Sequence, residues 1–148
     1  MRVKLKLNSD KRESVRMELE DMGVEISEEA DLILTEENYC EGELLCRRNE
    51  DRFLIPFEEI LYIESQGKEV FVYTGKSKFS AAVRLYMLER TLPAEKFIRI
   101  SNSVIINRTA IKKIRPALSQ KFYLTLKNDA VVDVTRSYYV RFKDYYGI

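Results

Sequence analysis

The chain has 148 residues, 25 of them Lys or Arg and 24 Asp or Glu, and it contains no histidine. The missing histidine excludes Ser-His-Asp and Cys-His catalysis and every His-ligated metal site, and two cysteines alone do not complete a usual structural zinc site. The length suggests one ordinary domain, or one domain with a small appendage. No run approaches the roughly 20 apolar residues of a membrane helix, and the N-terminus has no signal-peptide core. We therefore expect a cytoplasmic protein.

Residues 1–42 predict a small α/β extension. Residues 2–7 alternate charged and apolar side chains, which is typical of a half-buried strand. A helix follows and ends at Gly23, with Val15, Leu19 and Met22 on one face. Two short apolar runs at 24–26 and 32–34 are candidate strands, and residues 36–43 form an acidic connector.

Residues 43–148 predict a β-rich domain. Ten short runs rich in β-branched and aromatic residues are separated by turn signals such as those at 65–68 and 127–129. The predicted strands are 44–47, 52–56, 60–65, 70–74, 77–81, 98–100, 104–107, 111–115, 122–126 and 131–135. So many short strands in about 95 residues imply packed, mostly antiparallel sheets.

One short helix interrupts these strands. Ser80 is the predicted N-cap, an apolar stripe runs from Val83 to Leu92, and Pro93 ends the helix. The aromatic segment 137–148 is predicted to close the fold as a short helix or a turn. The expected fold class is therefore mainly β, with one short helix, preceded by the α/β extension.

The nearly neutral total charge hides two halves of opposite sign. Residues 1–50 carry 8 basic and 14 acidic side chains, a net charge of −6, whereas residues 51–148 carry 17 and 10, a net charge of +7. A basic half suggests a polyanionic partner, although a solvated basic surface explains it as well. Cys40 and Cys46 lack redox or zinc spacing and are interpreted as reduced thiols.

Motifs of catalysis are missing from the sequence. The five glycines are isolated, so there is no phosphate-binding loop, and there is neither a Gly-x-Ser-x-Gly elbow nor a cluster of metal ligands. We therefore expect no enzymatic activity, no cofactor, no metal and no small-molecule substrate.

Three polar segments are candidates for binding. In the first, Ser101-Asn102-Ser103 lies between two apolar runs and follows Arg99. It reads equally well as a turn that bonds its own backbone and as a loop that offers amide and guanidinium groups to DNA. The other two segments are loop-like: 134–138 with Arg136, and a hairpin tip with Gln66, Gly67 and Lys68. The arginine and glutamine are side chains that read guanine and adenine, and lysine reaches phosphate.

These segments belong to a longer pattern. It comprises Phe57-x-x-Ile60-x-Tyr62-Ile63-Glu64-Ser65-x-Gly67-Lys68, then Leu92-Pro93-x-x-x-Phe97-x-Arg99-Ile100-Ser101-Asn102-Ser103-x-Ile105-x-Asn107, then Ile111-x-x-Ile114, and finally Val134-x-Arg136-x-Tyr138. The pattern resembles the LytTR (LytR/AgrA-type) DNA-binding domain, the output domain of many bacterial response regulators, over about residues 45–148.

The resemblance implies three antiparallel sheets with little helix, and DNA recognition by loops in two successive major grooves and the minor groove between them. On matching positions, Asn102 takes the minor-groove role and Arg136 a major-groove base contact. The third contact falls on the hairpin with Gln66 and Lys68, where some members of the family carry His and this chain does not. Arg99 matches an arginine that supports the same surface, and Ser103, Lys68 and Tyr138 are candidate phosphate contacts.

The sequence thus predicts a bacterial transcriptional regulator that binds double-stranded promoter DNA at repeated sites, as a homodimer. Only about 40 residues precede the LytTR part, so we expect a stand-alone regulator without a receiver domain. The extension is then a dimerisation element or contacts a partner protein, and a membrane-protein partner is one hypothesis for control. The alternative is a protein-interaction module that acts through the acidic extension; RNA binding is a weaker third option.

Overall fold

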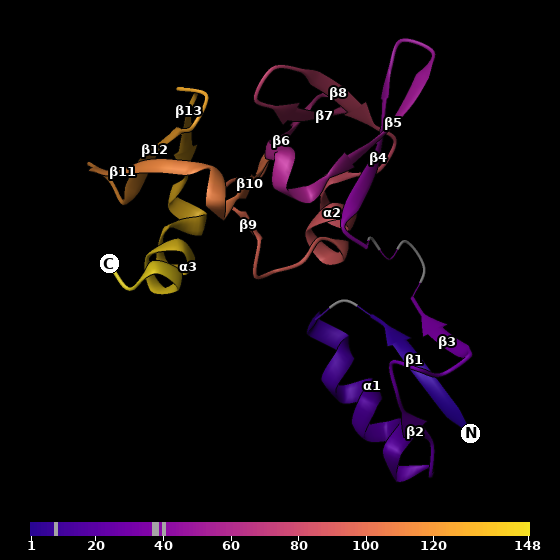
Figure 1. Cartoon of the computed structure of the whole chain (residues 1–148). Helices are drawn as coiled ribbons and strands as arrows, with labels where there is room; N and C mark the ends of the chain where they lie inside the picture. Colours follow the sequence, from indigo (N-terminus) through magenta and orange to yellow (C-terminus); the bar gives the residue numbers. More distant parts are fainter. Residues whose placement is uncertain (8, 37–38, 40) are drawn as a thin grey trace.

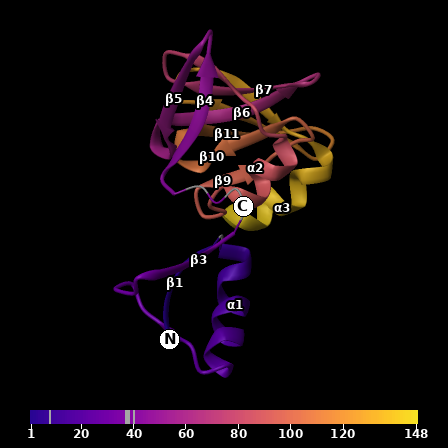
Figure 2. The same ribbon diagram turned by 90° about the vertical axis from the view of Figure 1, so that its right-hand side faces the viewer.

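The computed structural model describes residues 1–7, 9–36, 39 and 41–148. Figures 1 and 2 show the first elements of the chain on one side of the connector and the ten later strands on the other. Cys40, expected to be a reduced thiol, lies outside the described residues, whereas Cys46 is a buried free thiol. No helix in the described ranges is long and apolar enough to cross a membrane.

The N-terminal unit is a three-stranded parallel sheet with one helix. Its order of strand, helix, strand and strand is the one that the sequence patterns predict. Its elements are β1 (Arg2–Lys6), α1 (Ser9–Asp21), β2 (Glu25–Ile26) and β3 (Leu32–Thr35), and the strand order is β2-β1-β3. Val15 and Leu19 of α1 pack on the buried side chains of β1 and Leu7. Met22, predicted on the same face, is instead 74% exposed. The helix ends at Asp21, and the positive φ of Gly23 (+83°) then turns the chain back toward β2.

All ten strands predicted for residues 43–148 are present, with ends that differ from the prediction by at most two residues. They are β4 (Glu43–Arg48), β5 (Asp51–Pro56), β6 (Ile60–Gln66), β7 (Glu69–Thr74), β8 (Lys78–Ala81), β9 (Phe97–Arg99), β10 (Val104–Asn107), β11 (Ile111–Ala117), β12 (Lys121–Leu126) and β13 (Val131–Val134). Short 3-10 turns at Phe57–Glu59 (η1) and Arg108–Ala110 (η2) precede β6 and β11.

These strands form two antiparallel sheets, not the three that the resemblance implies. One has the order β5-β4-β8-β7-β6-β10-β9 and the other the order β11-β12-β13. The difference lies at one junction, where Arg47 of β4 pairs with Ser80 of β8. This pairing joins the β4–β5 hairpin to the neighbouring strands and merges two sheets into one.

The β-rich region carries two helices: the one expected in the fold class, and one in the C-terminal segment predicted as a short helix or a turn. Helix α2 spans Leu85–Thr91 and is preceded by Arg84, so the predicted N-cap Ser80 is wrong. Ser80 lies in β8, where its hydroxyl donates to the carbonyl of Arg47 (3.4 Å) and is therefore committed to the sheet. The aromatic C-terminal segment forms the 11-residue helix α3 (Arg136–Tyr146), anchored by the fully buried Phe142.

Strand β10 runs between two hydrophobic cores. Ile105 packs with Phe57, Ile60 and Leu88, whereas Ile106 on the opposite face packs with side chains from β12, β13 and α3. At the end of the strand the buried Asn107 donates from Nδ2 to the carbonyls of Phe57 (3.1 Å) and Ile60 (2.9 Å). β10 is therefore held on both faces and at its C-terminal end, which fixes the position of the loop before it.

Candidate nucleic-acid interface

The loop Ser101–Ser103, between β9 and β10, is rigidly held by backbone hydrogen bonds. The Ile100 N–H donates to the carbonyl of Val104 (3.0 Å), and the Ser65 N–H of β6 donates to the carbonyl of Ser103 (2.8 Å). Inside the loop, the Ser103 N–H donates to Oγ of the buried Ser101 (3.2 Å), the local bond that Ser forms in turns. The first sequence reading, a turn that bonds its own backbone, is therefore confirmed, and the DNA-binding reading stays a prediction. The serine bonds its own backbone, and Asn102 is left exposed at the tip.

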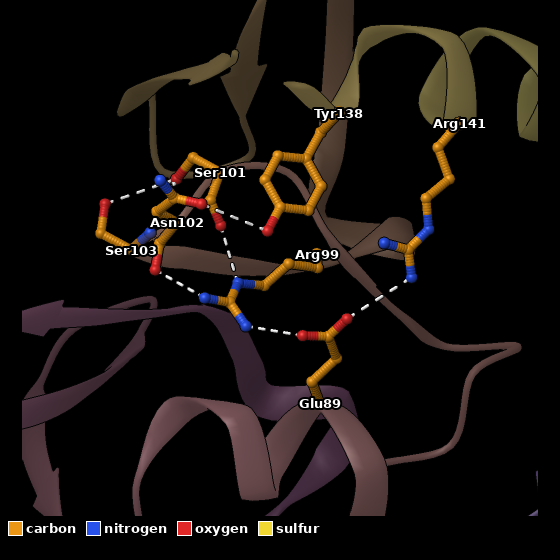
Figure 3. Close-up of polar contacts among 7 residues, drawn as sticks. All are labelled: Glu89, Arg99, Ser101, Asn102, Ser103, Tyr138 and Arg141. Carbon is orange, nitrogen blue, oxygen red and sulfur yellow. Dashed lines mark hydrogen bonds and ion pairs between the residues drawn. The ribbon is translucent and has the colours of Figure 1, made fainter. Parts of the chain in front are cut away.

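The largely buried side chain of Arg99 supports this loop from inside the protein. Its Nε donates to the carbonyl of Ser101 (2.7 Å) and one Nη to the carbonyl of Asn102 (2.6 Å). The other Nη forms an ion pair with Glu89 of α2 (2.6 Å), and the Arg99 side chain is only 11% exposed (Figure 3). Each nitrogen of the guanidinium thus makes one contact within the protein, and Arg99 shapes the surface from inside.

The segment with Arg136 and Tyr138 is the first turn of helix α3, not the loop that the sequence suggested. The Thr135 N–H just before the helix donates to the carbonyl of Ile100 (3.0 Å), which joins this turn to the base of the Ser101–Ser103 loop. The Tyr138 hydroxyl donates to Oδ1 of Asn102 (3.4 Å; Figure 3). Arg136 is exposed and pairs with none of the described residues.

The hairpin tip between β6 and β7 lies next to the same loop in the sheet. Ser65, whose N–H donates to the carbonyl of Ser103 in the loop, is followed directly by Gln66 at the tip. Gly67 has a positive φ (+62°) that suits the two-residue turn. The Gln66 amide nitrogen donates to Glu64 (2.8 Å) and lies 3.4 Å from the Tyr73 hydroxyl, so it is partly occupied. Lys68 is exposed and is unpaired within the described part of the chain.

An open groove of about 640 Å³ connects several of these groups. Its lining includes Glu64, Asn102, Ser103, Lys121, Asp133 and Arg136. Of the predicted site residues it gathers Asn102, Ser103 and Arg136. The remaining four, Gln66, Lys68, Arg99 and Tyr138, lie outside the lining.

Sequence reasoning missed Glu89 and Arg141 of this network and Lys121 of the groove. Glu89 accepts from Arg99 and also from Arg141 of α3 (3.4 Å), and these three residues lie on three separate elements. No spacing in the sequence indicates such a contact, because Glu89 and Arg141 are 52 residues apart. Lys121, at the start of β12, was also missed, and it adds a positive charge to the groove.

The arrangement suits recognition of a polyanion. Within the described ranges no three Asp, Glu, Cys or His side chains are grouped in a way that could hold a metal ion. The exposed groups of the groove include an amide, hydroxyls and unpaired cations beside the carboxylate of Asp133. The amide, the hydroxyls and the cations are donors of the kind that contact base edges and phosphates.

Comparison with known proteins gives a consistent result. A family model described as the LytTr DNA-binding domain matches residues 50–147. The sensory transduction protein LytT of Enterococcus faecalis is 30% identical over 115 residues, which is 77% of this chain and 48% of the relative. The transcriptional regulatory protein YpdB of Escherichia coli K12 is 30% identical over 91 residues, 61% of this chain and 37% of the relative. The chain thus matches about half or less of the length of these curated relatives.

A solved structure shows the same fold. The LytTr DNA-binding domain of a response regulator from Bacillus cereus superposes with a TM-score of 0.71 at 27% sequence identity. The match covers 74% of this chain and all of the other.

Proposed function

The chain belongs to the LytTR family of DNA-binding domains, and we propose that it is a transcriptional regulator that reads promoter repeats through the surface around the Ser101–Ser103 loop. The observation that carries this proposal is the groove shared by Asn102 and Arg136. Two exposed donors from separate elements, one of them an arginine without a partner among the described residues, open onto one surface.

Each polar element takes its own part in the proposed recognition. Arg136 donates in bidentate fashion to guanine in a major groove, since none of the described residues occupies its guanidinium. Asn102 at the loop tip enters the intervening minor groove. Gln66 and Lys68 approach the next major groove, where the partly occupied Gln66 amide reads a base and Lys68 contacts phosphate. Ser103 contacts phosphate, the Tyr138 hydroxyl orients the Asn102 amide, and Arg99 holds the loop from within the protein.

Substitution of single side chains tests this assignment. Operator sequences are first selected from random duplex DNA, and binding is then measured for Asn102→Ala, Arg136→Ala and the control Lys76→Ala. Lys76 is exposed in the β7–β8 turn, at the opposite end of β7 from the hairpin tip. We expect each of the first two variants to lose about ten-fold or more in operator affinity while the melting temperature stays unchanged. Retention of full specific binding by both variants would contradict the proposal.

The N-terminal unit is proposed to mediate dimerisation, so that two subunits occupy neighbouring repeats. Its strand β3 is an edge strand whose four residues are all exposed, including Leu32, Ile33 and Leu34. Deletion of residues 1–42 tests this, with circular dichroism to verify folding and sedimentation equilibrium to measure self-association. Loss of self-association with retained DNA binding supports the proposal. Loss of specific DNA binding by the folded remainder would instead favour an interaction module centred on the acidic unit, and tighter binding to competing RNA would favour an RNA target.

A further inference from the structure

We propose that Glu89 of helix α2 is a positioning residue for DNA recognition, which it serves by joining the Ser101–Ser103 loop to helix α3. The inference rests on the proposed function, because it names a residue behind the same DNA-binding surface. Glu89 contacts Arg99 through Oε2 (2.6 Å) and Arg141 through Oε1 (3.4 Å), so that one carboxylate bridges β9 and α3 (Figure 3).

The position of Glu89 is set by the hydrophobic core. Its neighbour Leu88 is 1% exposed, and Leu85 and Leu92 are also buried in the same core cluster. Helix α2 is therefore fixed on the body of the domain. Glu89, 31% exposed, projects from that fixed helix toward the two arginines.

The link from Glu89 to the loop runs through the guanidinium of Arg99. That group donates to the carbonyls of Ser101 and Asn102, and Glu89 accepts from its remaining nitrogen. A largely buried guanidinium that loses its carboxylate partner is strongly disfavoured and moves toward solvent. The two carbonyls on either side of the Asn102 side chain would then lose the donors that fix the loop.

The sign of the charge makes the inference testable. A carboxylate near a DNA surface repels phosphate, so its removal normally strengthens binding to any duplex. If Glu89 positions the loop, its removal instead weakens binding to the operator while binding to unrelated DNA rises. A residue without a positioning role strengthens both.

The experiment uses the full chain with the selected operator and a scrambled duplex of equal length. Fluorescence anisotropy measures the affinity of Glu89→Gln and of the control Glu69→Gln, which makes the same chemical change at an exposed side chain that pairs with none of the described residues. We expect Glu69→Gln to strengthen both complexes. We expect Glu89→Gln to weaken the operator complex by about ten-fold and to leave the scrambled complex equal or tighter. Parallel strengthening of both complexes by Glu89→Gln would overturn the inference.

A second comparison separates positioning from a general loss of stability. In an Arg99→Ala background, Glu89→Gln should produce no further loss of operator affinity, because both changes break the same contact. Fully additive losses would show that Glu89 acts by another route. If the unaltered chain does not distinguish the operator from the scrambled duplex, the proposed function itself fails. If the unaltered chain does distinguish them and Glu89→Gln preserves the ratio, only the present inference fails.

Discussion

One asparagine lies in the loop before strand β10 and another ends the strand, and their surroundings are opposite. Before the strand, Asn102 stands exposed at the tip of a loop, and among the described residues the side-chain amide of Asn102 has one partner, the Tyr138 hydroxyl. At the end of the strand, Asn107 is 3% exposed, and its amide donates to two carbonyls and accepts from the N–H and hydroxyl of Thr109. The same amide therefore serves a surface at one end and the interior at the other.

The difference shows how a binding loop is given a fixed shape. The buried asparagine ties β10 to η1 and the start of β6, and the strand between the two asparagines is buried along its whole length. With its end and both faces held, β10 presents the loop before it without needing interactions from the exposed side chain. Specificity can then reside in Asn102 while stability resides in Asn107.

The largest expected effect comes from Asn107→Ala. The substitution removes the donors to the Phe57 and Ile60 carbonyls and the acceptor of the Thr109 N–H, all in a buried site. Buried polar groups left without partners cost about 1–3 kcal/mol each, and we expect a total loss of about 2–3 kcal/mol because part of the site relaxes. Urea unfolding measures it. The matched variant Asn102→Ala should stay within about 0.5 kcal/mol of the unaltered chain, and equal losses for the two variants would remove the contrast.

Ser101→Ala should give an intermediate effect. Ser101 is buried, yet it belongs to the loop, and its Oγ accepts from the Ser103 N–H (3.2 Å) and lies 3.4 Å from the Ser103 hydroxyl. Loss of one such bond costs about 1 kcal/mol, and the loop loses part of its shape. We expect both a lower unfolding free energy and a several-fold weaker operator complex. An effect on stability alone would place Ser101 with the interior.

The stability of the fold should depend on pH through Cys46, which lies in the core cluster that also contains Phe57, Ile60 and Ile105. Burial raises the pKa of the Cys46 thiol from 9.0 to about 11. The folded chain therefore keeps a proton that the unfolded chain loses, and the free energy of unfolding falls as the pH rises from about 9 to about 11. Cys46→Ala should show a shallower fall in that range, while operator binding at pH 7 should not change. Identical pH profiles for the two chains would contradict the raised pKa.

The sequence predicted the interior of this domain better than its surface contacts. Short runs rich in β-branched and aromatic residues, separated by turn signals, located all ten strands of residues 43–148. The helix cap at Ser80 failed, since the hydroxyl that suits a cap also suits a strand edge, and only the pairing with Arg47 decides between them. The contacts of Glu89 were not predictable either, because they arise from packing between α2, β9 and α3.

For the candidate site residues, too, local signals were predictive and contacts between distant elements were not. A polar interruption between two apolar runs located Ser101, Asn102 and Ser103. This signal is local in the sequence and does not depend on contacts that form on folding. The setting of Arg136 was misread because an arginine at a loop and one in the first turn of a helix have the same local neighbours. Arg99 points inward and contacts Glu89, ten residues earlier on another element, and this contact has no local signal. The sequence could therefore name the polar side chains but not which of them remain available to DNA.

Tyr138→Phe should give the smallest effect. It tests whether the exposed Asn102 side chain before β10 is held by a contact within the protein. The hydroxyl lies 3.4 Å from Oδ1 of Asn102, a long hydrogen bond, so its removal should leave the unfolding free energy unchanged within about 0.5 kcal/mol. If the phenol orients the Asn102 amide, Tyr138→Phe lowers operator affinity about two- to three-fold and leaves the affinity for the scrambled duplex unchanged. In an Asn102→Ala background, Tyr138→Phe then has no effect on operator affinity. If the phenol contacts a phosphate directly, both duplexes lose affinity equally, and the loss persists in that background. We expect the first pattern, because the hydroxyl proton already has an acceptor on Asn102 and a phosphate would have to displace it.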